Sequence, residues 1–153
     1  MNMKINQLRL LNKKEYLIVN SNQFQSDNDF LDFIAANLEQ GIQIIQLDEK
    51  HFNDAKTIEL GKKTRELCSI YGALFIINSR IDIAQILEAD GVHLEENGIS
   101  PHQAREILGN NTIIGLTAPN TTITPNDVDY IFTDQKAENV KITQFIFNEI
   151  KKN

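Results

Sequence analysis

Six short apolar segments recur along this 153-residue chain, and stretches with helical spacing of apolar residues separate most of them. Short segments that are apolar throughout are typical of strands buried on both faces, and such strands form parallel sheets when helices alternate with them. The sequence therefore predicts an α/β domain with a parallel sheet. The expected strands lie near residues 16–20, 42–48, 73–79, 90–95, 112–118 and 129–134.

The stretches between these segments carry helix boundary signals. Gly41, Gly72 and Gly109 follow three of them as C-terminal stops, and the Ser100-Pro101 pair supplies an N-cap followed by proline at the first helical position. The expected helices span about 29–40, 53–71, 82–88 and 100–109.

The chain after residue 134 has a different pattern, which predicts at most a short strand at Val140–Thr143 and one amphipathic helix around Phe145, Ile146 and Ile150. A full eight-unit barrel rarely takes fewer than about 200 residues. We therefore expect a TIM-barrel-like β/α domain that is incomplete, with about six to seven strands. Its open edges would favour self-association into a homo-oligomer.

Composition narrows the class of protein. No Pro/Gly/Ser-rich linker divides the chain, so residues 1–153 are expected to form one domain. The net charge is −6 and the basic residues are scattered, which argues against a nucleic-acid partner. Cys68 is the only cysteine, and no segment approaches the roughly 18 apolar residues that a membrane span needs. These features predict a cytoplasmic protein that does not contact a membrane.

Polar residues gather where the expected strands end. In parallel α/β folds the loops after the strands converge on one face, so these residues can form one site. The alternative for the LDEKH segment (47–51) is a solvated loop with local ion pairs, and the alternative for His93 is a hydrogen-bonded histidine in the barrel interior. The candidate ligand-binding residues are Gln46, Asp48, Lys50, Asn78, Ser79, His93, Glu95 and Thr117.

The common nucleotide and hydrolase motifs are absent, but three other segments resemble the thiamine phosphate synthase/TenI family. They are GIQIIQLDEK (41–50), YGALFIINSRIDIA (71–84) and ADGVHLEENGISPHQAREILG (89–109), and they occur in the order and spacing of that family. The resemblance implies a TIM barrel. For the synthase branch it also implies that hydroxymethylpyrimidine diphosphate is joined to a thiazole phosphate with Mg²⁺, releasing pyrophosphate.

The resemblance is weaker where that chemistry lies. Asp48 replaces the phosphate-facing arginine of the family's Q-L-R-E-K motif. Ser79 replaces one metal-binding aspartate, and Gly98 stands where the second would be. Because proteins hold Mg²⁺ through carboxylates and phosphate oxygens, the resemblance implies that this chain has lost its magnesium ligands.

The thiazole-tautomerase branch is not matched in full either, because Thr117 stands for the serine of the fifth strand and Pro119 for the histidine after it. The first hypothesis is therefore a family member without catalytic residues, metal or other cofactor, which retains a pocket for a small polar, thiamine-related ligand. The second is an active thiamine-pathway enzyme in which Asp48, Glu95 or Glu96 serves as a substitute ligand for Mg²⁺ or as a general base. The third is a scaffold or regulatory subunit.

Overall fold

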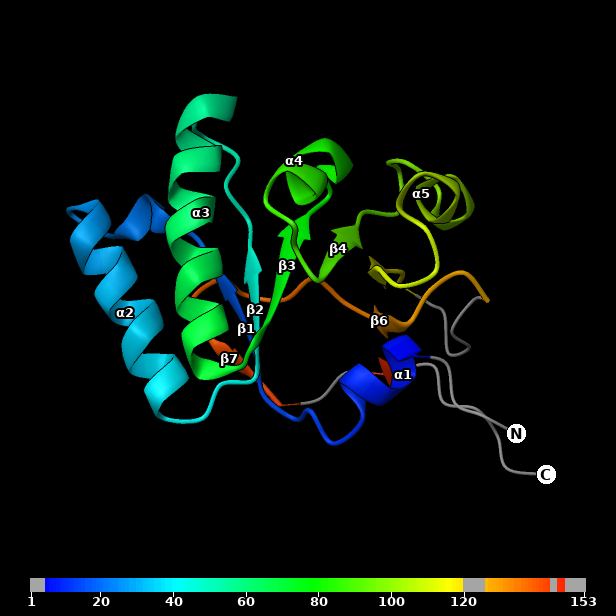
Figure 1. The fold of residues 1–153 in the computed structure, drawn as a ribbon, viewed down its shortest axis with the longest axis horizontal. Coiled ribbons are helices and arrows are strands. Elements are labelled where there is room, and N and C mark those ends of the chain that lie inside the picture. The colour runs from blue at the N-terminus through cyan, green and yellow to red at the C-terminus, as the bar shows by residue number, and fades with distance from the viewer. Residues whose placement is uncertain (1–4, 120–125, 144–145, 148–153) are drawn as a thin grey trace.

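The computed structural model describes residues 5–119 and 126–143 and the backbone of 146–147. Its centre is one curved sheet with the strand order β7-β1-β2-β3-β4-β5-β6-β8 (Figure 1). Strands β1 to β6 pair in parallel, whereas β7 pairs antiparallel with β1, and β8 with β6. The strands are β1 (Tyr16–Val19), β2 (Ile44–Leu47), β3 (Leu74–Asn78), β4 (Gly91–Leu94), β5 (Ile113–Thr117), β6 (Tyr130–Phe132), β7 (Lys141–Ile142) and β8 (Ile146–Phe147).

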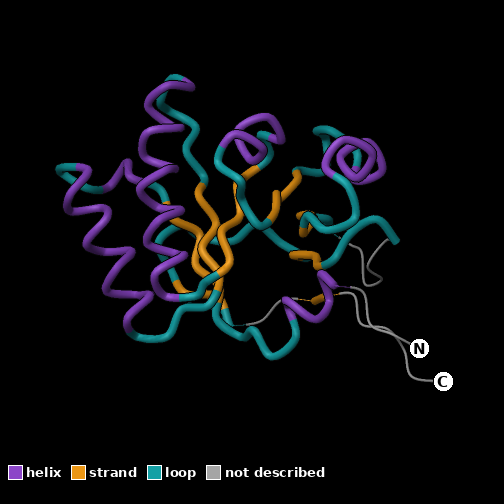
Figure 2. Tube along the Cα trace, in the orientation of Figure 1, coloured by secondary structure: helices purple, strands orange, loops and turns teal. Residues whose placement is uncertain are grey.

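Four helices, α2 to α5, follow strands β1 to β4 in turn and lie along one face of the sheet (Figure 2). The boundaries follow local chemistry: the Ser26 side chain caps α2, Asn53 caps α3, and Ser100 forms a capping box with Gln103 at the start of α5. Gly72 ends α3 in the left-handed conformation, at φ 68°. The helices are α1 (Ile5–Leu10), α2 (Asp27–Glu39), α3 (Asp54–Tyr71), α4 (Ile81–Ile86) and α5 (Pro101–Leu108).

The sheet separates two hydrophobic clusters, as the alternation of side chains along a strand requires. The outer cluster lies between the sheet and helices α2 to α5 and includes Phe30, Ile34 and Leu60. The inner cluster fills the concave side and includes Tyr16 and Tyr130. Both faces of the parallel strands are therefore buried, as their apolar sequences predicted.

The predicted fold is confirmed: the domain is an incomplete, TIM-barrel-like α/β sheet whose six parallel strands fall within one or two residues of the expected ranges. The helix expected around Phe145, Ile146 and Ile150 is wrong at Ile146, which lies in β8; Phe145 and Ile150 lie outside the described residues. The reason is that the edge of β6 would otherwise leave backbone N–H and C=O groups unpaired. Strand β8 pairs with this edge and satisfies them. Helix α1 was not predicted from the sequence.

The sheet curls far enough to bring β1 and β6 together across the concave side. The hydroxyl oxygens of Tyr16 and Tyr130 are 2.6 Å apart, and the rings of Tyr16 and Phe132 have centroids 4.9 Å apart. Gly115 on β5 makes room for this contact, because a Cβ there would lie 2.1 Å from Cζ of Tyr130. The concave side is thus a packed interior and not an open groove.

Candidate functional site

The structure places seven of the eight predicted site residues in two groups, and the eighth, Glu95, accepts a hydrogen bond from Asn78. Four of them line a cavity of about 220 Å³ at the carboxyl ends of β2 and β3: Asp48, Lys50, Asn78 and Ser79. Three others, Gln46, His93 and Thr117, point into the interior of the curled sheet and are buried. Asn78 connects the groups, since its amide donates hydrogen bonds both to Gln46 Oε1 (2.9 Å) and to Glu95 Oε1 (3.1 Å).

A chain of hydrogen bonds crosses the interior from this point. Gln46 Nε2 donates to the hydroxyl of Tyr16 at 2.6 Å, and the Tyr16 and Tyr130 hydroxyls are bonded to each other. The Tyr130 hydroxyl lies 3.1 Å from His93 Nδ1, and His93 Nε2 lies 2.7 Å from Thr117 Oγ1. With Asn78 on β3, the side chains of six strands are thereby linked across the interior.

The order of donors along this chain follows from its first member. Asn78 must donate to the carboxylate of Glu95, which orients its amide, and Gln46 is then oriented to accept from Asn78 and donate to Tyr16. If each tyrosine hydroxyl donates its hydrogen within this series of hydrogen bonds, Tyr16 donates to Tyr130, and Tyr130 donates to His93 Nδ1. The imidazole then carries its proton on Nε2.

Burial sets the charge state of the interior groups. It lowers the pKa of His93 to about 3, so the ring is neutral at physiological pH. Burial also raises the pKa of the Tyr16 and Tyr130 hydroxyls, which therefore stay protonated. Of the two alternatives for His93, the hydrogen-bonded interior histidine is the one that the geometry matches.

The cavity outside this interior has a different character, because charged groups line it. Asp48 is only 4% exposed, and Lys50 Nζ lies 3.5 Å from its Oδ2 atom. Burial raises the pKa of Asp48 to about 6; Lys50 opposes this rise, and the carboxylate of Glu138 adds to it. The Oδ1 atom of Asp48 is buried and has no hydrogen-bond partner among the described residues.

Arg80, at the rim of the cavity, is held by two carboxylates. Its NH1 and NH2 atoms bind the Asp54 carboxylate at 2.9 and 3.2 Å, and its Nε and NH2 atoms bind Asp82 at 3.0 and 2.8 Å. Ser79, one residue before, has a left-handed backbone (φ 58°), and its N–H donates to the His93 carbonyl at 2.7 Å. The ion pairs of Arg80 lie outside the LDEKH segment, in which Lys50 pairs with the buried Asp48.

Magnesium does not fit the residues of this site. Ser79 contributes no carboxylate, Gly98 lies in the loop after β4, and the ammonium group of Lys50 lies 3.5 Å from the Asp48 carboxylate. Nowhere in the part of the chain that the structure describes do three or more His, Cys, Asp or Glu side chains form a group that could hold a metal ion. The side chains present cannot by themselves supply the carboxylate-rich shell that Mg²⁺ needs.

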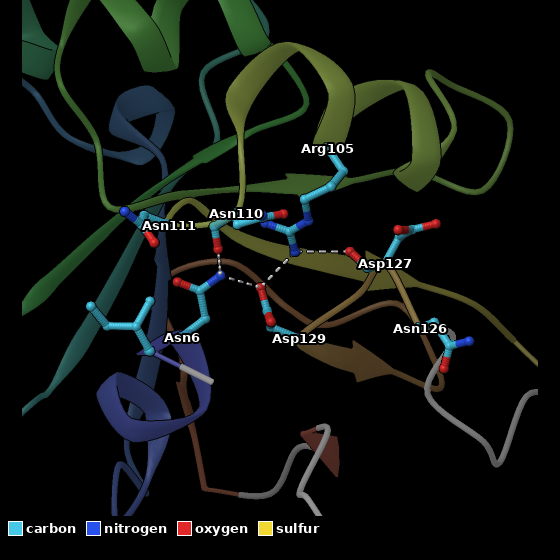
Figure 3. A pocket seen from close by; sticks show the side chains of 8 residues that line it. Asn6, Arg105, Asn110, Asn111, Asn126, Asp127 and Asp129 are labelled. Carbon is cyan, nitrogen blue, oxygen red and sulfur yellow. Dashed lines mark hydrogen bonds and ion pairs between the residues drawn. The ribbon is translucent and has the colours of Figure 1, made fainter. Parts of the chain in front are cut away.

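A larger cavity, of about 440 Å³, lies at the opposite end of the sheet, near α1 and the start of β6 (Figure 3). Its central groups bind one another. Arg105 on α5 donates to Asp129 Oδ2 at 3.0 Å, Asn6 on α1 donates to the same oxygen at 3.2 Å, and Asp129 Oδ2 also accepts from the N–H of Ile114. In barrel folds the residues at the amino ends of the strands contribute to stability, so we interpret this network as one that stabilises the fold. Sequence reasoning missed it, because Asn6 and Asp129 are 123 positions apart and form no motif.

A sequence model of the family described as "Thiamine monophosphate synthase" matches residues 15–133, which include both groups of candidate residues. This chain belongs to that family. The match confirms the resemblance seen in the sequence. As a separate finding, no helix among the described residues is long and apolar enough to cross a membrane.

Individual relatives of the family are similar over the same region. A thiamine-phosphate synthase of Campylobacter jejuni is 40% identical over 102 residues, which are 67% of this chain and 48% of the relative. A thiamine-phosphate synthase of Fusobacterium nucleatum is 42% identical over 92 residues, 60% of this chain and 45% of the relative. The chain thus spans about half the length of these relatives.

A solved structure shares the fold. The thiamine phosphate pyrophosphorylase of Pyrococcus furiosus superimposes with a TM-score of 0.62 at 31% sequence identity, covering 72% of this chain and 52% of that protein. The incomplete sheet described above corresponds to about half of that family member.

Proposed function

We propose that this member of the family binds a small polar molecule of thiamine metabolism in the cavity at the carboxyl ends of β2 and β3. The observation that carries the proposal is that Asp48, Lys50, Asn78 and Ser79, named from two separate sequence motifs, line one cavity. Its position agrees with the rule that barrel folds bind ligands at the carboxyl ends of their strands.

The chemistry of the cavity supports binding more than it supports synthase catalysis. Expulsion of pyrophosphate needs cations to stabilise the developing negative charge. Here Arg80 is bound by Asp54 and Asp82, and Lys50 is paired with Asp48. We therefore propose that synthase activity is weak or lost.

An active thiamine-pathway transferase is the second candidate, and the comparisons favour it more directly, since each relative described above bears the name of a synthase or pyrophosphorylase. In that case phosphate oxygens of the substrates would have to provide many of the magnesium ligands, with Asp48 or Glu95 adding carboxylates. A regulatory or scaffold role is the third candidate.

One experiment separates these candidates. The purified chain is incubated with hydroxymethylpyrimidine diphosphate, thiazole phosphate and Mg²⁺, and pyrophosphate release is followed by a coupled assay. The same compounds and thiamine phosphate are tested by thermal shift, because a ligand of the native state raises the melting temperature. A shift without turnover supports the binding role, and turnover that depends on both substrates supports the transferase. Neither shift nor turnover would leave the scaffold role, which a pull-down from cell extract then tests.

A further inference from the structure

We propose that the cavity at the ends of β2 and β3 takes a compact organic cation with N–H donors, an amine or an amidinium, and does not take a phosphate. This inference rests on the proposed function, because it assumes that the cavity holds a ligand. It follows from which polar groups of the cavity are already occupied and which are not.

The cationic groups of the cavity are occupied. Arg80 directs its guanidinium at two carboxylates through four hydrogen bonds, those to Asp54 and Asp82. Lys50 faces the carboxylate of Asp48. A phosphate would have to compete with these carboxylates for both cations.

The groups left without partners are acceptors. The Oδ1 atom of Asp48 and the Oε2 atom of Glu49 are both buried, and neither accepts a hydrogen bond from an N–H or hydroxyl donor within the described parts of the chain. The carboxyl group of Glu138 also lies beside Asp48, and it adds negative charge there. The side chain of Asp48 is 5% exposed, so water reaches it poorly. Buried acceptors without a donor are costly, and ligand N–H groups would remove that cost, whereas phosphate oxygens would add to it.

The net charge of the cavity lining also favours a cation over an anion. Three carboxylates line the cavity, those of Asp48, Glu49 and Asp54, against the two cations Lys50 and Arg80. An entering anion would therefore meet a net negative wall, and an entering cation would neutralise it.

The cavity also has the means to admit such a cation. The Lys50 side chain is 55% exposed, so its ammonium can turn to solvent when a ligand ammonium takes its place beside Asp48. Phe52 and Ile83 provide apolar surface for the carbon skeleton of a small ligand. A volume of about 220 Å³ limits that skeleton to roughly one ring.

Isothermal titration calorimetry of the full chain at pH 7.5 tests the proposal. The probes are benzamidine, unphosphorylated hydroxymethylpyrimidine, hydroxymethylpyrimidine diphosphate and inorganic pyrophosphate. We expect benzamidine to bind at least tenfold more tightly than pyrophosphate. Asp48→Asn and Glu49→Gln should each weaken benzamidine binding at least tenfold, whereas Glu59→Gln, on the exposed side of α3, should leave it unchanged. Circular dichroism checks that each variant is folded.

Four results would overturn the inference. Pyrophosphate could bind more tightly than benzamidine, or Asp48→Asn and Glu49→Gln could both leave benzamidine binding intact. If the pyrimidine diphosphate binds and neither benzamidine nor the unphosphorylated pyrimidine does, this inference fails while the proposed function stands. If no probe binds, and the thermal-shift compounds also have no effect, both fail.

Discussion

His93 Nε2 lies 2.7 Å from the hydroxyl oxygen of Thr117, while Nδ1 of the same ring lies 3.1 Å from the hydroxyl of Tyr130. Both ring nitrogens of a fully buried histidine are therefore bound to neutral hydroxyl groups. A histidine with two such partners is held in one orientation and one protonation state.

The state of this ring is the first prediction. We expect the proton on Nε2. In the series of interior hydrogen bonds, Tyr16 donates its hydroxyl hydrogen to Tyr130, and Tyr130 then donates its own to His93 Nδ1. Nitrogen-15 NMR of the imidazole should show a protonated Nε2 and an unprotonated Nδ1, unchanged between pH 8 and pH 5, since burial lowers the pKa of His93 to about 3. A ring that titrates near pH 6.5, or one protonated on Nδ1, would contradict this.

Gly115 gives the second prediction. A Cβ at this position would lie 2.1 Å from Cζ of Tyr130, a buried ring in the middle of the interior network. Gly115→Ala should therefore lower the free energy of unfolding by roughly 2–3 kcal/mol, the cost of overpacking a core. Urea denaturation measures the change. Gly98→Ala is the matched control, because the nearest atom to its Cβ would be 3.6 Å away, and it should change stability little.

The third prediction concerns the pH dependence of stability. Burial raises the pKa of Asp48 from 3.8 to about 6 in the folded chain, so the folded state binds more protons than the unfolded state between about pH 4 and pH 6. The stability of the wild type should therefore fall as pH rises through this window. Asp48→Asn, which cannot ionise, should be more stable than the wild type by about 3 kcal/mol at pH 7, taking 1.36 kcal/mol per pKa unit.

The comparison of the two proteins isolates Asp48. His93 acts in the opposite direction, since a histidine with a lowered pKa loses stability as pH falls below about 6.5, but it does so in both proteins and cancels in the difference. Urea denaturation at pH 4.5, 6 and 7.5 should show a stability difference that grows with pH. A constant difference would mean that the Asp48 carboxyl is not desolvated as the structure places it.

The fourth prediction concerns the network at the opposite end of the sheet. Asp129 and Arg105 are both largely buried and lie 3.0 Å apart, and Asp129 also binds Asn6 and the N–H of Ile114. Removal of one partner of a buried pair costs about 3–5 kcal/mol, so Asp129→Ala should destabilise the fold by this order. Thermal or urea denaturation measures it. Asp127→Ala, at a half-exposed neighbour whose carboxylate pairs with His102, should change stability by less than about 0.5 kcal/mol.

The strands and four of the helices could be predicted from the sequence because local signals define them. Apolar runs mark β1 to β6, and the Ser100-Pro101 pair and Gly72 mark helix ends. Edge strand β7 lies within the short strand expected at Val140–Thr143. Edge strand β8 could not be predicted, because residues 146–147 lie in a segment with helical spacing of apolar residues and pair with the open edge of β6 only in the folded chain.

The candidate site was predicted only in part. Its residues lie at the strand ends, as the parallel topology requires, but the sequence could not show that Gln46 and His93 bind groups of the interior while Asp48 and Lys50 line a cavity. That division depends on Tyr16 and Tyr130, which come from strands 114 positions apart. The ligand-binding roles of these residues and homo-oligomer formation stay predictions, and sedimentation velocity would test the latter.

The two edge strands also carry a consequence for the width of the domain. Strands β7 and β8 lie on opposite edges of the sheet, yet Ile142 and Ile146 are only four positions apart. Four residues of fully extended chain reach about 14 Å at most, so covalent length alone limits how far the two edges can separate. Inserting glycines between Ile142 and Ile146 would remove this limit on the separation of the edges without altering a single side chain of the interior.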